Sequence, residues 1–498
     1  MQLQFEKQEI PCLHTLKREV QSQEQTQEIR VSDGMPDIGS VIGAWGQVIL
    51  RSKEWQADAM NISGGTMVWV QYLPEEGGQP CCVESWLPFQ MRWPLPQTQH
   101  DGTILAQCIL RGVDARSTSA RKMMLRSNVS VLAWAMENQE GEIFAPVDVP
   151  EDVELLKRTY PMELPVEAGE KAFSLEETLS LPPSAPRMEK PVYFSIQPEI
   201  TEERMMGDKV VFRGNAVLHM LYSADDGGEY SWDFDLPFTQ YSELDREYGD
   251  DAEVMLWPAV TALEVDREEE RMNLKAGFVC QYRITHRPMI EVVEDAYSPR
   301  RSVTTVLQEL ELPGILERQD RIIHVQQNSP VDGMRLTDIQ FLPQPVGQRS
   351  TGEEVTLEIP GQFQLLYYDI EGTPRSSISR WEDTVLLPAG EESRVEASVW
   401  PAGKTQGSLM SGSAQLSTDI IVMIETASAG GTPMVTGLEL GELREQDSKR
   451  PSLIIRRPAG QTLWELAKDC GSTVSAIREA NGLQTEPVDE ILLLIPVI

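Results

Sequence analysis

The sequence predicts a mainly β, multidomain protein with three related β-rich domains followed by a small βααβ module. A chain of 498 residues is too long for one hydrophobic core. Residues 40 to 440 are dominated by alternating or continuous apolar segments bounded by Gly, Pro, Asn and Asp, a pattern typical of strands and turns. Long stretches of helical period are few in that part of the chain, and two short helical patterns lie near the C-terminus. We therefore expect domains over residues 1–165, 166–300, 301–445 and 450–498.

Three strand-like segments resemble one another. They are GTMVWVQY (65–72), NAVLHMLY (215–222) and GQFQLLYY (361–368). In each, apolar residues two apart end in Tyr, so their side chains share one face of a strand and should form a buried stripe. The stripes are Val68, Val70 and Tyr72, then Leu218, Met220 and Tyr222, then Phe363, Leu365 and Tyr367. The Tyr positions recur after 150 and then 145 residues, which indicates a triplicated domain.

The charge balance limits the partners that we expect. The chain has 78 acidic and 43 basic side chains and a formal charge of −35. Residues 450–498 hold five Lys/Arg and six Asp/Glu, so nearly all the excess lies before them. A negative field repels phosphate backbones and anionic lipid surfaces, so we expect no nucleic acid partner and no membrane insertion.

The location is predicted from what the sequence lacks. It shows no apolar run of about 18 residues and no signal-peptide pattern at its start, so we expect no signal peptide and a cytoplasmic protein. The six cysteines form no Cys-x-x-Cys pair, which fits a reducing compartment.

The βααβ module is predicted from its local signals. LII (453–455) and ILLLI (491–495) are short apolar strands with two helical patterns between them. Thr462 and Glu465 form a capping box at the start of the first helix. Its apolar face is Leu463, Leu466, Ala467 and Cys470. The second helix ends at Asn481-Gly482, a left-handed C-cap followed by Leu483.

These residues resemble the LysM module. The matching segments are Pro458-x-Gly460-x-Thr462-Leu463-Trp464, Gly471-x-Thr473-Val474, Ala480-Asn481 and Ile495-Pro496; Gln461 stands where LysM modules usually carry Asp. In LysM modules, N-acetylated glycans lie in a shallow groove between the loop entering the first helix and the loop leaving the second. By resemblance, the binding residues here are Gly460, Gln461, Thr462, Leu463, Trp464, Asn481, Gly482 and Leu483. Each of the capping residues also has a purely structural explanation.

The body is similar to SPOCS domains of endospore-coat proteins. The similarity covers EQTQEIRVSDGMPDIGSVIGAWGQV (24–48), the repeated strands, Leu-Pro-Phe at 87–89 and 236–238, and Trp-Pro at 257–258. Three SPOCS-like domains before one LysM module resemble the clostridial-type spore coat morphogenetic proteins. This resemblance implies a non-enzymatic adaptor or scaffold in the mother-cell cytoplasm, at the forespore surface in the spore coat. The module would dock onto the basement-layer ATPase of the coat, with Trp464 as an aromatic anchor, and the body would contact other coat proteins.

The alternative is a protein of the cell wall or cortex that binds the N-acetylglucosamine glycan of peptidoglycan, or a wall hydrolase. Export across the membrane would distinguish the two wall hypotheses from the coat hypothesis, because a wall protein must be exported. No reactive cluster favours an enzyme. The five His do not have the spacing of a helical zinc site, and we expect no metal and no cofactor. Cys280 and His286 would lie about 20 Å apart along a strand, too far for a thiol peptidase. Asp233 and Asp235 are predicted to face solvent from an amphipathic strand.

Overall fold

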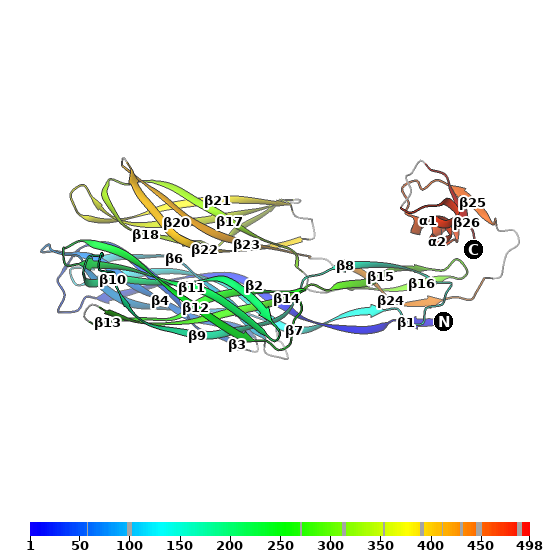
Figure 1. The fold of residues 1–498 in the computed structure, drawn as a ribbon, viewed down its shortest axis with the longest axis horizontal. Coiled ribbons are helices and arrows are strands. Elements are labelled where there is room, and N and C mark those ends of the chain that lie inside the picture. Colours follow the sequence, from blue (N-terminus) through cyan, green and yellow to red (C-terminus); the bar gives the residue numbers. More distant parts are fainter. Residues whose placement is uncertain are drawn as a thin grey trace.

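The chain folds into a mainly β molecule. The computed structural model describes residues 1–56, 58–96, 102–268, 271–310, 315–351, 354–388, 393–410, 412–428, 432–444, 451–485 and 491–498. Strands make up 77% and helices 3%, which confirms the predicted mainly β class. Figure 1 shows an elongated molecule in which a broad body narrows into a stalk that contains the N-terminus, while the C-terminal module lies beside the far end of the stalk.

The first repeat in the body has two antiparallel sheets. Its strands are β2 (Glu6–Arg30), β3 (Ile38–Gln56), β4 (Ala59–Pro74), β5 (Cys81–Pro94), β6 (Thr103–Ser119) and β7 (Lys122–Ala145). One sheet has the order β2-β7-β6 and the other is the meander β3-β4-β5. The first and last strands of the repeat therefore lie side by side.

The second and third repeats have the same pairing order. The second contains β9 (Leu164–Ser180), β10 (Met188–Met206), β11 (Lys209–Ala224), β12 (Glu229–Glu243), β13 (Ala252–Glu268) and β14 (Arg271–His286). The third contains β17 (Ile315–Pro330), β18 (Gly333–Pro343), β19 (Gly347–Thr351), β20 (Glu354–Asp369), β21 (Pro374–Pro388), β22 (Ser393–Met410) and β23 (Ser413–Ser428). Their sheets are β9-β14-β13 with β10-β11-β12, and β17-β23-β22 with β18-β20-β21, where β19 also pairs with β20. One topology thus occurs three times along the chain.

The three predicted stripes lie in the middle strands of the meanders, β4, β11 and β20. Their side chains are buried, except that Tyr367 is half-buried. Tyr72 and Tyr222 also donate hydrogen bonds to equivalent carbonyl oxygens, those of Pro36 (3.0 Å) and Pro186 (3.2 Å). The period-two pattern therefore identified the central strand of each repeat correctly.

The stalk is built by strands that extend from the repeats. Besides β2 and β7 of the first repeat, it contains five strands that belong to no repeat: β1 (Gln2–Gln4), β8 (Glu154–Pro161), β15 (Met289–Tyr297), β16 (Val303–Leu310) and β24 (Thr432–Leu440). β8 pairs with β15, β16 pairs with β24, β1 adds to β24, and β2 and β7 stay paired along their whole length. The domain boundary expected between residues 165 and 166 falls within β9, the one between 300 and 301 falls between β15 and β16, and the last one lies outside the described residues.

The repeats pack together as a closed ring. One apolar cluster contains Trp45 of the first repeat, Tyr193 of the second and Leu366 of the third. Trp45 and Tyr193 stack with ring centroids 5.3 Å apart. Glutamine side chains join each repeat to the next: Gln47 Oε1 accepts from Ile196 N (2.9 Å), Gln197 Nε2 donates to Pro401 O (3.3 Å) and Gln364 Nε2 donates to Ala44 O (2.6 Å). The body is therefore one framework rather than three loosely linked domains.

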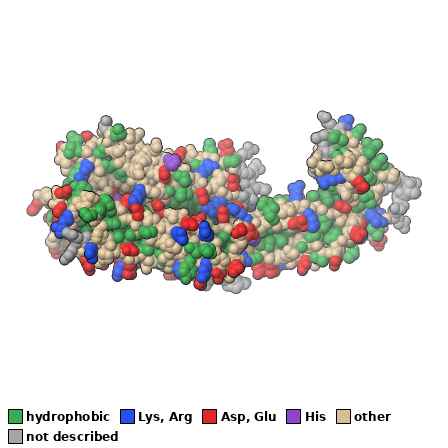
Figure 2. Space-filling model, in the orientation of Figure 1, with side chains coloured by type: hydrophobic (Ala, Val, Ile, Leu, Met, Phe, Trp, Pro, Cys, Tyr) green, Lys and Arg blue, Asp and Glu red, His purple; other side chains and the backbone are tan. Residues whose placement is uncertain are grey.

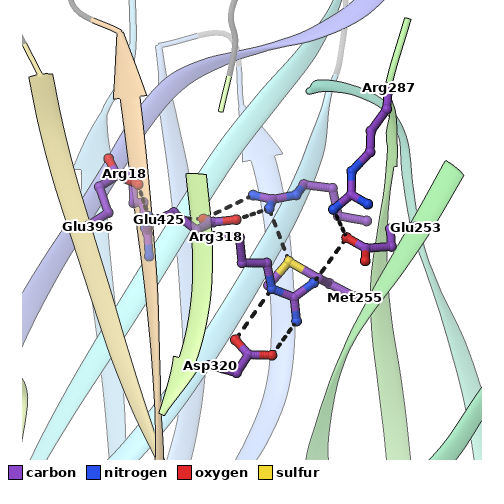
Figure 3. Close-up of polar contacts among 9 residues, drawn as sticks. Arg18, Glu253, Met255, Arg287, Arg318, Asp320, Glu396 and Glu425 are labelled. Carbon is purple, nitrogen blue, oxygen red and sulfur yellow. Dashed lines mark hydrogen bonds and ion pairs between the residues drawn. The ribbon is translucent and has the colours of Figure 1, made fainter. Parts of the chain in front are cut away.

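A buried ion cluster also joins the three repeats (Figure 3). Glu425 on β23 pairs with Arg18 on β2, with 3.5 Å between Nη1 and Oε2, and with Arg283 on β14. Arg18 also pairs with Glu396 on β22. Burial opposes ionisation of Glu425, but Arg283 and Arg18 outweigh it and lower the pKa of this carboxyl. Loss of the carboxylate would leave two buried guanidinium groups without that partner.

The C-terminal module as candidate binding site

The module folds in the predicted order βααβ. Its elements are β25 (Leu453–Arg456), α1 (Leu463–Cys470), α2 (Val474–Asn481) and β26 (Leu493–Pro496), and β25 pairs antiparallel with β26. Its core is formed by Leu463, Leu466, Ala467, Cys470, Ile477, Leu493 and Ile495. Leu463 is fully buried, so it supports the fold rather than a ligand-facing surface.

The loop entering α1 is ordered by local hydrogen bonds. Thr462 Oγ1 accepts from Glu465 N (3.3 Å), and Glu465 Oε2 accepts from Thr462 N (2.8 Å), which is the predicted capping box. Gln461 Nε2 donates to Asp469 Oδ2 (2.9 Å). Gly460 has a φ of +85° and is exposed, so this position favours glycine for its backbone conformation.

The loop leaving α2 is fixed by Asn481. Its Nδ2 donates to Ile477 O (2.8 Å) and Leu494 O (2.6 Å), and its Oδ1 accepts from Leu494 N (2.8 Å). Gly482 is the left-handed C-cap, with a φ of 63°. Leu483 packs against the same apolar cluster that contains Leu463, so the two predicted loops meet at one core. The Asn481 amide thus binds the module's own backbone.

Trp464 contacts the stalk strand β15 within the same chain. Its ring meets Tyr297 edge to face, with centroids 4.7 Å apart and planes at 78°. Its Nε1 donates to Asp295 Oδ2 (2.9 Å), and Lys468 Nζ pairs with the same oxygen at 2.7 Å. Tyr297 donates from its hydroxyl to Ser472 O (3.0 Å). The ring proposed as a partner anchor is therefore half-buried against the stalk.

This docking contact, formed by Asp295, Tyr297, Trp464, Lys468 and Ser472, was missed by sequence reasoning. Tyr297 is 5% exposed and belongs to the module's apolar cluster, although it lies at the end of β15. Its burial, with smaller effects of Glu154 and Asp295, raises the pKa of its hydroxyl. No local pattern marks such a pair, because the partners are more than 160 residues apart in the chain.

The exposed apolar side chains of the module gather on its strands. Leu453 and Ile455 are two apart on β25, and Ile455 lies opposite Leu494 on β26. They are 46%, 61% and 39% exposed, whereas Ile454 and Ile495 point to the core. Ile491, Leu492 and Ile498 are also exposed. We call Leu453, Ile455 and Leu494 the strand face; β25 and β26 lie on the outer side of the module in Figure 1, and Figure 2 shows hydrophobic side chains on its surface.

A second polar cluster lies between the second and third repeats. His219 Nδ1 is 2.6 Å from Asp233 Oδ1, and its Nε2 is 2.9 Å from Asp338 Oδ1. Burial opposes the charge on His219, but the two carboxylates outweigh it and raise its pKa to about 10. A protonated imidazole that faces a carboxylate at each nitrogen has no lone pair with which to accept a proton. The cluster is therefore structural. Asp235 is exposed as predicted, but Asp233 is half-buried in this cluster, so the prediction for this strand face is only partly correct.

Among the described residues, no group of three or more His, Cys, Asp or Glu is placed to hold a metal ion. In the same part of the chain, neither helix has the length and apolar character needed to span a bilayer. Comparison with protein-family models, with curated protein sequences and with solved structures finds no match.

Proposed function

We propose that this protein is a non-enzymatic adaptor of the bacterial endospore coat. Its C-terminal module docks onto the basement-layer ATPase at the forespore surface, and its body serves as a rigid framework for other coat proteins. The proposal rests on the resemblance of the chain to SPOCS-like domains followed by a LysM module. It also predicts that the protein works in the mother-cell cytoplasm.

The strand face is the observation that best supports a protein partner. Exposed apolar patches on soluble proteins commonly mark interaction surfaces. The strand face presents large aliphatic side chains on two paired strands, and these side chains stay exposed while Trp464 contacts the stalk. A partner can therefore reach it while the module stays docked.

The arrangement of the body suits a scaffold. The ring contacts and the buried ion cluster join the three repeats into one unit. Partners bound to different repeats would therefore be held at fixed positions relative to one another. Many acidic side chains lie on the surface that Figure 2 shows. Their mutual repulsion keeps free copies apart until a partner neutralises them.

Substitution on the strand face tests the proposal. We expect Ile455→Asp to weaken binding of the purified basement-layer ATPase by more than about tenfold, because a charge would replace a central apolar contact. Leu386→Asp on β21 is a matched control, since Leu386 is 63% exposed and Ile455 is 61% exposed. Equal binding by wild type and Ile455→Asp would contradict the use of this face.

The same proteins distinguish the alternative, binding of N-acetylglucosamine glycan in the wall or cortex. The loops that contain Gly460 and Asn481 would hold the sugar, and a Cβ added at Gly460 would meet no atom within 4 Å. Saturable binding of chitooligosaccharides by the full chain, without binding of the ATPase, would favour that alternative.

A further inference from the structure

A cavity of about 560 Å³ lies between the three repeats. Its walls come from β3 and β6 of the first repeat, β10 and β13 of the second, and β17, β18, β22 and β23 of the third. Small-molecule sites in proteins commonly have volumes of about 300–1,000 Å³ and lie between packed units. The cavity therefore has the size and position of a ligand site.

The wall of the cavity is mixed, with more apolar than polar surface. Two similar segments line it. One is Trp257-Pro258-Ala259 on β13 of the second repeat, and the other is Trp400-Pro401-Ala402 on β22 of the third repeat. Val48, Ile196, Phe341 and Met423 are further lining residues. Asp320 and Glu203 also line it and are exposed, so the cavity reaches solvent near them. An apolar molecule would lose contact with water on entering.

Two buried amide oxygens have no partner within the protein. Gln107 is 9% exposed; its Nε2 donates to Val399 O (2.9 Å), but its Oε1 is unpaired. Gln340 Oε1 is likewise buried and unpaired. Both residues line the cavity. A buried acceptor without a donor is unfavourable, but neither oxygen has appreciable water-accessible surface, so a donor in the cavity reaches them only when these side chains turn toward it.

We propose that this cavity binds an uncharged, mostly apolar small molecule that carries N–H or O–H donors. The aromatic and aliphatic parts of the wall would hold the apolar part, and the two glutamine oxygens, once turned toward the molecule, would accept its hydrogen bonds. This site is separate from the strand face and from the docking contact. Since all three repeats contribute to its walls, a bound molecule would also stabilise the ring.

N-phenyl-1-naphthylamine is a suitable probe, because it is uncharged and apolar, has one N–H, and fluoresces more strongly away from water. We expect saturable binding with one molecule per chain. Ala259→Phe, which fills part of the cavity, should abolish it while thermal unfolding shows that the variant folds. No saturable binding by wild type, or equal binding by a folded Ala259→Phe, would overturn the proposal, because the latter would place the probe elsewhere.

A second comparison tests the glutamine oxygens. Gln340→Met should weaken the probe about fivefold, the effect of one lost uncharged hydrogen bond. It should leave unchanged the affinity of 1-phenylnaphthalene, a competitor of similar shape that lacks the N–H. Gln362→Met is a matched control, since Gln362 Nε2 binds Arg111 O at the junction of two repeats and does not line the cavity. If neither Gln340→Met nor Gln107→Met affects the probe, donor recognition is wrong.

Discussion

Replacing Tyr297 with alanine should release the module from the stalk. Its ring packs against Trp464, its hydroxyl binds Ser472 O, and only 5% of it is exposed. Truncating a buried aromatic side chain to alanine costs about 3–5 kcal/mol. Because each 1.4 kcal/mol or so is a factor of ten, the undocked fraction should rise roughly 10²- to 4 × 10³-fold.

The Trp464 indole N–H reports this change directly, because it is bonded to Asp295 only across the docking contact. Its exchange with solvent can be followed by NMR after ¹⁵N-tryptophan labelling and assigned with Trp464→Phe. We expect much faster exchange in Tyr297→Ala than in wild type. Tyr160→Ala is the control, since Tyr160 lies on the paired strand β8 and its hydroxyl bonds to Glu294. An unchanged Trp464 exchange rate in Tyr297→Ala would refute the docking contact.

Three further predictions concern charged groups. Asp295→Asn should make undocking less sensitive to salt in the same exchange measurement, because the pair with Lys468 is partly exposed and screened; equal salt dependence would contradict this. Glu425→Ala should lower the free energy of unfolding in urea by about 3–5 kcal/mol by leaving two buried arginines without this partner. Glu253→Ala, which removes a partly exposed carboxylate, should cost less than about 1 kcal/mol, and similar losses for both variants would contradict the buried cluster. The stability that His219 adds is complete below its unfolded pKa of 6.5 and is lost as pH rises through about 10. Urea midpoints should therefore fall toward about pH 11 in wild type but less in His219→Gln, and parallel curves would contradict this role.

Local patterns predicted much of the fold. Alternating apolar residues located the central strand of each repeat, since side chains two apart share one face. The capping box at Thr462 located the start of α1, because its hydrogen bonds join residues three apart. Such features depend only on near neighbours in the chain, so they can be predicted from the local sequence.

Features that join distant segments were not predictable in this way. The long strand β2 is rich in Gln and Glu, and it forms because its backbone pairs with β7 while most of its side chains face solvent. Asp233 follows a solvent-facing alternation, yet its partner His219 also binds Asp338 of the third repeat, which half-buries Asp233 between two repeats. Trp464 has the features of an open anchor, and only the position of Tyr297 shows that it is occupied. Each of these depends on which segments the fold brings together.

The affinity of the protein for the basement-layer ATPase, compared with that of a chain lacking residues 450–498, tests the adaptor proposal most directly. Urea unfolding of the shortened chain would establish that its three repeats still fold. We predict that the full chain binds and the shortened, folded chain does not. Equal affinity of the two chains would contradict the proposal that the module makes the contact.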